Sequence, residues 1–184
     1  FGVPETVARD WGADLEAAVA LGVPHVSLYG LTAEPGTPLG RQVEEGRIRM
    51  PDEDRYRDEY LLAHDRLTRA GYDHYEVSSF ALPGHESLHN SAYWSGAPFL
   101  GLGNGAHSLV AGHRWWNLRD WDAYRDRTRA GASPVEERER LGRSQEALEQ
   151  VWLGLRCTRG LPLTLLSAGP AGDLETRYAE FETA

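Results

Sequence analysis

Cysteine is almost absent from this chain of 184 residues, in which Cys157 is the single thiol. One thiol cannot close an internal disulfide, and it cannot supply the several thiolates that an iron–sulfur cluster needs. The chain by itself is therefore not expected to hold such a cluster. The absence of disulfides is typical of reducing compartments, so we expect a cytoplasmic location.

Lysine is absent, and all 19 basic residues are arginine. A genome-wide codon bias explains this better than a function does. Because the net charge is −9, the surface as a whole does not favour phosphate backbones, and we expect no nucleic-acid partner. No apolar run approaches the roughly 20 residues of a membrane helix, so stable insertion is not expected, although peripheral contact with a membrane stays open.

The first part of the chain has the pattern of a helix followed by a strand. Residues 1–4 read like the end of a strand and lack an initiator Met, which predicts that the chain is a fragment. Apolar residues at helical spacing predict a helix over 6–21, with Thr6 as its N-cap and Gly22 as its end. The β-prone run 25–29 follows, and this order predicts an α/β fold with a parallel sheet.

Periodicity and turn residues predict the elements that come next. They are, in order, a turn-rich loop over 30–40, a helix over 52–70, a strand over 72–80, a long aromatic loop over 81–99, a hairpin over 108–117 and a short helix over 120–130.

A second domain is expected to begin after a short linker. The small and proline-containing segment 132–134 separates an expected domain of residues 1–131 from one of residues 132–184. Beyond the linker, Arg- and Glu-rich sequence predicts helices of a small module. This part includes apolar residues at helical spacing, namely Leu148, Val151, Trp152 and Leu155.

The segment from His85 to His89 matches the H-E-x-x-H motif of zinc proteases. That chemistry needs both histidines on one face of a helix and a third ligand. Pro83–Gly84 directly precede the motif, and the next acidic residue after Glu86 is Asp120. A zinc protease site is therefore not expected here.

The glycine-rich run 101–106 superficially resembles a dinucleotide-binding fingerprint. Its third glycine comes one residue early and a hairpin follows, whereas the fingerprint opens a helix. Two interpretations stay open for these glycines. They permit either close approach of a flat ligand to the backbone or tight turns alone.

The run His89-Asn90-Ser91-Ala92-Tyr93-Trp94 gathers polar and aromatic side chains able to hold a flat, partly polar ligand. An imidazole can ligate haem iron axially, and aromatic rings can cover the faces of a porphyrin. Spacing alone favours the simpler alternative, in which Tyr93 and Trp94 fill a core and His89 caps a turn.

Several runs, taken together, resemble one protein family. They are 27–29, 31–32, 34–37, 70–81, 83–86, 89–94, 101–103, 105–108 and 116–117. This set is similar to the HemW-type, coproporphyrinogen III oxidase-like branch of radical SAM proteins. The H-N-x-x-Y-W run at His89–Trp94 is its most specific part.

The resemblance implies a fold and two cofactors. It implies an α/β fold in which residues 1–131 are the C-terminal part of a (β/α) TIM-like barrel and residues 132–184 begin a helical, winged-helix-like domain. Full-length members hold a [4Fe–4S] cluster and S-adenosylmethionine (SAM), with the cluster cysteines in an N-terminal half that this chain lacks. The chain therefore resembles the C-terminal half of such a protein.

The resemblance also implies roles for single residues. Leu31 and Thr32 would border the adenine end of SAM. His89 would be the axial ligand of haem iron, and Asn90, Tyr93 and Trp94 would belong to the same haem site. Arg114 or Arg119 could pair with haem propionates.

The function implied by the resemblance is that of a haem chaperone, which binds haem and inserts it into acceptor proteins. The alternative is an enzyme, an oxygen-independent coproporphyrinogen III oxidase of porphyrin biosynthesis that uses radical SAM chemistry. The chain alone is expected to be inactive in such chemistry, because Cys157 cannot hold the cluster by itself.

Overall fold

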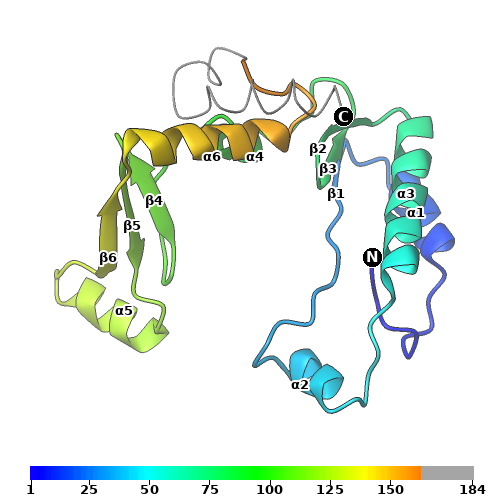
Figure 1. The fold of residues 1–184 in the computed structure, drawn as a ribbon, viewed down its shortest axis with the longest axis horizontal. Coiled ribbons are helices and arrows are strands. Elements are labelled where there is room, and N and C mark those ends of the chain that lie inside the picture. The colour runs from blue at the N-terminus through cyan, green and yellow to red at the C-terminus, as the bar shows by residue number, and fades with distance from the viewer. Residues whose placement is uncertain (163–184) are drawn as a thin grey trace, which may run out of the picture. The chain divides into compact units, whose positions relative to one another are not determined.

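The structure is a computed structural model and describes residues 1–162. The chain divides into two compact units, unit 1 over Phe1–Ser87 and unit 2 from Leu88 onward. Both units combine helices with a small sheet, which makes the fold mixed α/β as expected (Figure 1).

Unit 1 contains three helices and three short strands among its described residues. In chain order they are α1 (Trp11–Ala20), β1 (His25–Ser27), α2 (Pro38–Glu44), α3 (Glu53–Arg69), β2 (Asp73–Glu76) and β3 (Ser79–Ala81). The N-cap of α1 is Asp10 and not Thr6, because the Asp10 carboxylate accepts a hydrogen bond from the Ala13 amide at 3.0 Å. Gly22 ends this helix region with a φ of 64°, as predicted.

The strand expected over 72–80 is wrong in detail, because it is a hairpin. The chain turns between Glu76 and Ser79, so β2 and β3 pair antiparallel, and β1 pairs antiparallel with the other edge of β3. The parallel sheet expected from the order of helix and strand is therefore not found among the described strands, whose ladders are all antiparallel. Two hydrogen bonds beside the sheet of unit 1 do have a parallel pattern. The amino group of Phe1 donates to the Tyr29 carbonyl at 3.0 Å, and the Leu31 amide donates to the Phe1 carbonyl at 2.9 Å. This is the bonding pattern of a parallel bridge, with α1 in the connection.

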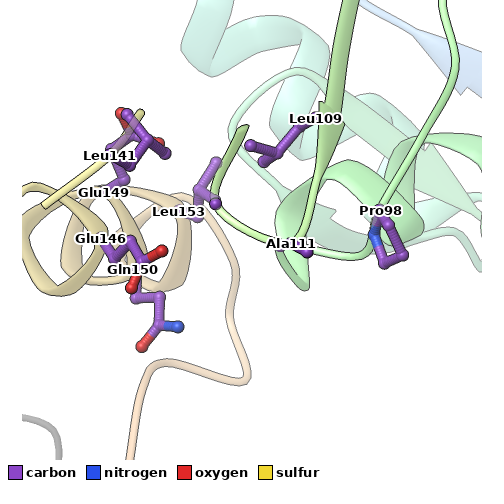
Figure 2. A pocket seen from close by; sticks show the side chains of 10 residues that line it. Pro98, Leu109, Ala111, Leu141, Glu146, Glu149, Gln150 and Leu153 are labelled. Carbon is purple, nitrogen blue, oxygen red and sulfur yellow. The ribbon is translucent and has the colours of Figure 1, made fainter. Parts of the chain in front are cut away.

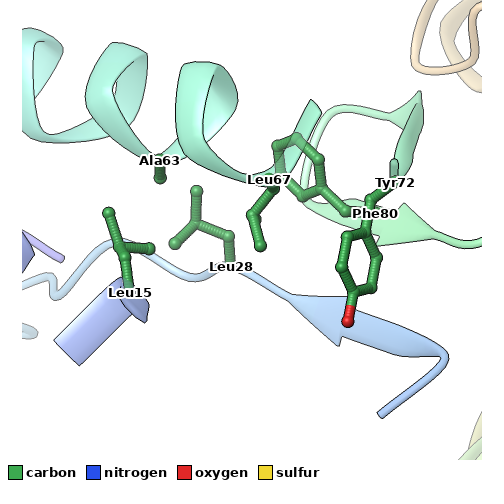
Figure 3. Close-up of a cluster of buried hydrophobic side chains, with 6 residues drawn as sticks. All are labelled: Leu15, Leu28, Ala63, Leu67, Tyr72 and Phe80. Atoms are coloured by element: carbon green, nitrogen blue, oxygen red, sulfur yellow. The ribbon is translucent and has the colours of Figure 1, made fainter. Parts of the chain in front are cut away.

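The core of unit 1 lies between α3 and the segments of α1 and β1 (Figure 3). Ala63 and Leu67 point from α3 toward Leu28, which directly follows β1, and Phe80 closes the same cluster from β3. The side chains of Ala63, Leu67 and Phe80 are fully buried. This apolar cluster fixes α3 over the sheet and so positions the loop that follows β1.

Unit 2 holds a three-stranded antiparallel sheet and three helices among its described residues. They are α4 (Leu88–Trp94), β4 (His107–Val110), β5 (His113–Asn117), α5 (Trp121–Arg129), β6 (Val135–Arg140) and α6 (Arg143–Leu155). The predicted hairpin is confirmed as β4 and β5, whose turn places Ala111 and Gly112 at φ values of 51° and 74°. The predicted short helix is confirmed as α5, capped by the Asp120 carboxylate.

The Arg- and Glu-rich sequence after the predicted linker begins with a strand where a helix was expected. The predicted helix that carries Leu148, Val151, Trp152 and Leu155 follows as α6 and is confirmed. Residues 132–134 lead directly into β6, which pairs antiparallel with β5. Pairing with β5 overrides the helix preference of glutamate and arginine. β6 is the outermost strand of the sheet, and most of its side chains are exposed and charged. The domain boundary at 131/132 stays a prediction, and residues 163–184 of the predicted second domain lie outside the described residues.

Both sheets in residues 1–162 are open and three-stranded, so this part of the chain forms no closed barrel. Within the same residues, none of the helices combines the length and the apolar character required to span a membrane.

Candidate functional site

The H-N-x-x-Y-W motif forms a helix, whereas an extended loop was expected over 81–99. The helix is α4, and it packs beside α6. Gly96, at a φ of 69°, closes α4. Its amide donates to the Tyr93 carbonyl, and the Ala97 amide donates to the Ala92 carbonyl, both at 3.0 Å. This pair of bonds is a Schellman motif, which explains why the helix stops directly after Trp94.

The helical conformation sorts the motif into two faces. His89 and Tyr93 are four residues apart and share one face, while Asn90 and Trp94 share the adjacent one. The His89 side chain is exposed, and its ring stands edge-on to Tyr93 with centroids 4.9 Å apart. The Tyr93 ring in turn packs edge-to-face with the ring of Phe99, with centroids 4.6 Å apart. The structure therefore links the exposed imidazole to a row of aromatic rings.

Trp94 lies against an arginine that the sequence did not single out. The guanidinium carbon of Arg156 lies 4.3 Å from the centroid of the Trp94 ring, a cation–π contact. The Nε1 atom of Trp94 is buried and has no hydrogen-bond partner among the described residues. An indole N–H left without a partner in an apolar setting is a free donor beside the motif.

A pocket of about 400 Å³ adjoins the motif, a volume within the usual range of small-molecule sites. Tyr93 and Trp94 line it from α4, but His89 does not. The other large apolar residues of its wall come from the segment before β4, from β4 and from α6, namely Phe99, Leu109, Trp152 and Leu153.

A second pocket of about 420 Å³ lies beside the first and shares part of its wall. Figure 2 shows Leu109, Ala111 and Pro98 on one side, and Leu153 with Glu146 and Gln150 on the side of α6. No aromatic residue lines this second pocket within the described chain. Flat aromatic ligands are therefore better matched by the pocket at Tyr93 and Trp94.

Arg114, a candidate partner for propionates, is already paired with two carboxylates. It contacts Glu139 on β6 at 3.0 Å and Glu149 on α6 at 2.5 Å. The hydrogen bond to Glu149 is the main reason that the pKa of the Arg114 guanidinium is raised. These contacts tie α6 to the sheet and leave Arg114 poorly suited to a further anion. The other candidate, Arg119, is exposed.

The glycine-rich loop is held by its own unit, which supports tight turns as the reason for its glycines. The side-chain nitrogen Nδ2 of Asn117 donates to the Gly103 carbonyl at 2.9 Å and to the Gly101 carbonyl at 3.4 Å. The Ser108 hydroxyl accepts from the Gly101 amide at 2.9 Å. Gly103 has a φ of 107°, and a Cβ at Gly101 would clash with the His107 carbonyl. These contacts need no ligand.

The histidines of the H-E-x-x-H run do not share a helix. α4 begins at Leu88, so His85 lies before it and only His89 is helical. Among the described residues, no group of three or more His, Cys, Asp or Glu side chains could hold a metal ion. The two histidines therefore do not share the helix face that the zinc-protease motif requires.

Leu31 and Thr32 belong to unit 1 and follow β1. Both are exposed, and the Leu31 amide already donates to the Phe1 carbonyl at 2.9 Å. A ligand at this position could therefore use the Leu31 side chain or the Thr32 hydroxyl, but not the Leu31 amide. The structure does not place these residues relative to the motif on α4, because the two lie in different units.

Sequence reasoning missed Phe99 and Arg156 as neighbours of the motif, and it placed Trp152 at helical spacing without giving it a role in the site. Trp152 is 69% exposed, as is Leu155, so the apolar stripe of α6 is not a core face of the described unit. An i, i+4 spacing shows which residues share a helix face, but it does not show what covers that face.

The chain is similar to curated proteins over nearly its whole length. It is 39% identical over 180 residues to "Heme chaperone HemW" of Mycobacterium tuberculosis, covering 98% of this chain and 46% of that protein. It is 36% identical over 163 residues to the protein of the same name from Synechocystis, covering 87% of this chain and 39% of that protein. The chain thus spans less than half the length of these relatives. No protein-family model matches the sequence.

The fold is also similar to that of a solved structure. The structure is that of Escherichia coli HemN, described as a coproporphyrinogen III oxidase and a radical SAM enzyme. The two superpose with a TM-score of 0.67, and the matched part covers 85% of this chain and 39% of the HemN chain. The sequence identity is 17%, so this likeness concerns the fold. From the sequence similarity and the shared fold, we conclude that the chain belongs to the family of HemW- and HemN-like radical SAM proteins.

Proposed function

We propose that the protein binds haem at α4 and passes it to haem-acceptor proteins, as a haem chaperone of the HemW type. The observation that carries this proposal is the exposed imidazole of His89, which stands edge-on to Tyr93 beside an aromatic pocket. The name of its curated relatives supports the same function.

The chemistry of this donor set fits haem. An imidazole nitrogen that reaches solvent is a common axial ligand of haem iron. The rings of Tyr93 and Trp94 offer apolar surface beside it, and the packing of Tyr93 against His89 restricts how the imidazole can turn. Asn90 shares a helix face with Trp94 and adds a polar group to the same site. Haem is cargo in this proposal, so an exposed site suits both uptake and release.

The residues of this chain do not fit a [4Fe–4S] cluster, because Cys157 is its one thiol. We therefore derive no radical step from these residues and expect no SAM cleavage by this chain alone. The alternative function, oxygen-independent coproporphyrinogen III oxidation, requires that cluster and so would belong to a longer protein. Leu31 and Thr32 are our candidates for the border of a SAM site in such a protein.

We further infer that residues 1–131 are part of a radical SAM barrel and that residues 132–184 begin a helical domain. The parallel bridge between Phe1 and the segment after β1 supports the first inference, since parallel strands joined by a helix are the repeating unit of such barrels. We expect the protein to act in the cytoplasm.

Haem titration followed by the Soret absorption tests the proposed function. We expect the protein to bind haem with the spectrum of an imidazole-ligated iron. Substitution of His89→Ala should weaken binding and change the spectrum, because the axial ligand is lost. The matched control is His113→Ala, an exposed histidine of the same unit that lies at the start of β5.

Two results would contradict the proposal at different levels. If the unsubstituted protein binds no haem, the proposed function is wrong. If it binds haem and the His89→Ala protein has equal affinity and an unchanged spectrum, then His89 is not the axial ligand.

A further inference from the structure

The pocket at Tyr93 and Trp94 is apolar on all sides except one. Four aromatic rings line it, from Tyr93, Trp94, Phe99 and Trp152, together with the aliphatic chains of Leu109 and Leu153. Trp152 is 69% exposed although it forms part of this wall. A large indole left open to water beside a concave apolar surface is typical of a ligand-binding wall.

The charged residues of the pocket wall are paired with each other. Arg114 and Glu149 are its charged lining residues, and the guanidinium also pairs with Glu139. This triad contains one more carboxylate than guanidinium, so its net charge is negative. An incoming carboxylate would meet an arginine whose donors already serve two carboxylates, and it would lose its hydration against an otherwise apolar lining.

Tyr93 connects this pocket to the candidate iron ligand. Its ring packs against those of His89 and Phe99, with centroids 4.9 Å and 4.6 Å apart, and it also lines the pocket. A flat ligand held by His89 therefore has a largely apolar cavity beside the ring that packs against that histidine.

We propose that this pocket receives the uncharged edge of a tetrapyrrole, with its vinyl and methyl groups, and rejects propionate-bearing edges. Trp152 is then a binding residue that sets specificity. It favours haem, which has one edge without carboxylates, over tetrapyrroles that carry propionates on every ring. This inference rests on the proposed function, because it concerns the same haem site.

The neighbouring pocket in Figure 2 does not offer the same selection. It lacks aromatic lining among the described residues, and Glu146 and Gln150 replace rings on its α6 side. An uncharged vinyl edge gains more from the aromatic pocket, because burying apolar groups against polar side chains leaves those side chains poorly hydrated.

The test compares two iron porphyrins that differ at this edge. Iron protoporphyrin IX carries vinyl groups, and iron coproporphyrin III carries propionates in their place. Equilibrium titration should show that the protein binds the first at least about tenfold more tightly than the second. Substitution of Trp152→Ala should weaken binding of the protoporphyrin by about tenfold and leave the coproporphyrin affinity nearly unchanged.

Two further variants complete the experiment. Trp121→Ala is the matched control, because Trp121 is also an exposed tryptophan of unit 2 but lies on α5 and does not line the pocket. It should change neither affinity. Glu149→Gln should strengthen coproporphyrin binding relative to protoporphyrin binding, since it removes a carboxylate and leaves Arg114 with one fewer anionic partner.

The results separate this inference from the proposed function. Binding of both porphyrins with equal affinity, or an equal loss of both in the Trp152→Ala protein, would overturn the selective pocket while leaving haem binding in place. Failure to bind either porphyrin would overturn both proposals. Circular dichroism of each variant identifies a loss of folding, and in that case Trp152→Leu, which keeps apolar volume without an aromatic ring, replaces the alanine variant.

Discussion

The ring of Tyr93 stands nearly perpendicular to the imidazole of His89, with an angle of 84° between the planes and 4.9 Å between the centroids. One helical turn separates the two residues on α4, so the helix itself imposes this contact. Edge-to-face packing of this kind limits the rotamers that the imidazole can adopt. Presentation of His89 to a ligand therefore depends on Tyr93.

Tyr93 variants test this dependence. Tyr93→Phe should retain haem affinity, because the ring and its contacts are kept. Tyr93→Ala should weaken haem binding by about threefold to tenfold, the amount expected when an aromatic pair is lost. Soret titration measures both affinities. Equal affinity of the alanine and phenylalanine variants would show that the ring does not position His89.

The end of α4 provides a second prediction. Gly96 has a φ of 69° and open space where a Cβ would lie, so a substitution there is strained by its backbone conformation alone. Gly96→Ala should lower the free energy of unfolding by about 1–2 kcal/mol. Urea denaturation followed by tryptophan fluorescence measures the change. Gly142→Ala is the control, because Gly142 has a φ of −79°, and its loss of stability should be smaller.

A third prediction concerns the buried amide of Asn117, which donates to two glycine carbonyls of the loop 101–103. Asn117→Leu keeps the volume but leaves the Gly101 carbonyl without this donor and the Gly103 carbonyl with the Ala106 amide alone, at 3.4 Å. The expected cost is about 1–3 kcal/mol of unfolding free energy. The exposed Asn104 donates to a single carbonyl, that of Arg119, so Asn104→Leu should cost less than about 1 kcal/mol. Equal costs in denaturant titrations would contradict a supporting role of Asn117.

Unit 1 contains two histidines whose rings are in direct contact. The Nδ1 atoms of His64 and His74 lie 3.0 Å apart, so one nitrogen must donate and the other accept. His74 also stacks on the buried ring of Phe80, with centroids 4.1 Å apart. Burial is the main cause that lowers the pKa of His74, and repulsion from His64 adds to it, against the hydrogen bond to the Val77 carbonyl and the charge of Glu76.

A lowered histidine pKa predicts loss of stability in acid. The unfolded chain takes up the proton near its ordinary pKa of about 6.5, whereas the folded chain resists it until lower pH. The contribution of His74 to the stability of unit 1 should therefore be fully present above about pH 6.5 and should fall as the pH decreases below that value. His74→Phe removes the titrating group and should reduce this fall between about pH 7.5 and about pH 5.5. The urea midpoints of both proteins at the two pH values test the prediction, and an identical fall would contradict it.

The sequence predicted elements well where local signals and tertiary packing agree. The hairpin of β4 and β5 has a turn glycine between β-prone runs, and α3 and α5 have aspartate caps at Asp52 and Asp120. Each of these signals acts within a few residues, so no long-range contact is needed to read it.

Short helices were missed because prolines and glycines around them predicted loops. α2 has a readable signal in retrospect, since Thr37 caps it through its hydroxyl and Pro38 occupies its first turn. α4 has no comparable start signal, and its end at Gly96 is clear only from the hydrogen bonds of the Schellman motif.

The site itself could be predicted only in part. The residues of the motif were evident, but their division into two helix faces was not, because the helix was missed. Trp152 and Arg156 join the motif through contacts between segments far apart in the chain, and Phe99 joins it because the chain turns back after α4. Spacing within one segment carries no information about such contacts.

The charged strand β6 has a consequence for how copies of the protein behave together. An outermost strand is a ready template on which another chain can form hydrogen bonds. Here such growth would strip water from a row of glutamate and arginine side chains. Stacking into filaments through this edge is therefore suppressed, and the sheet can stay open at high concentration without a protective cap.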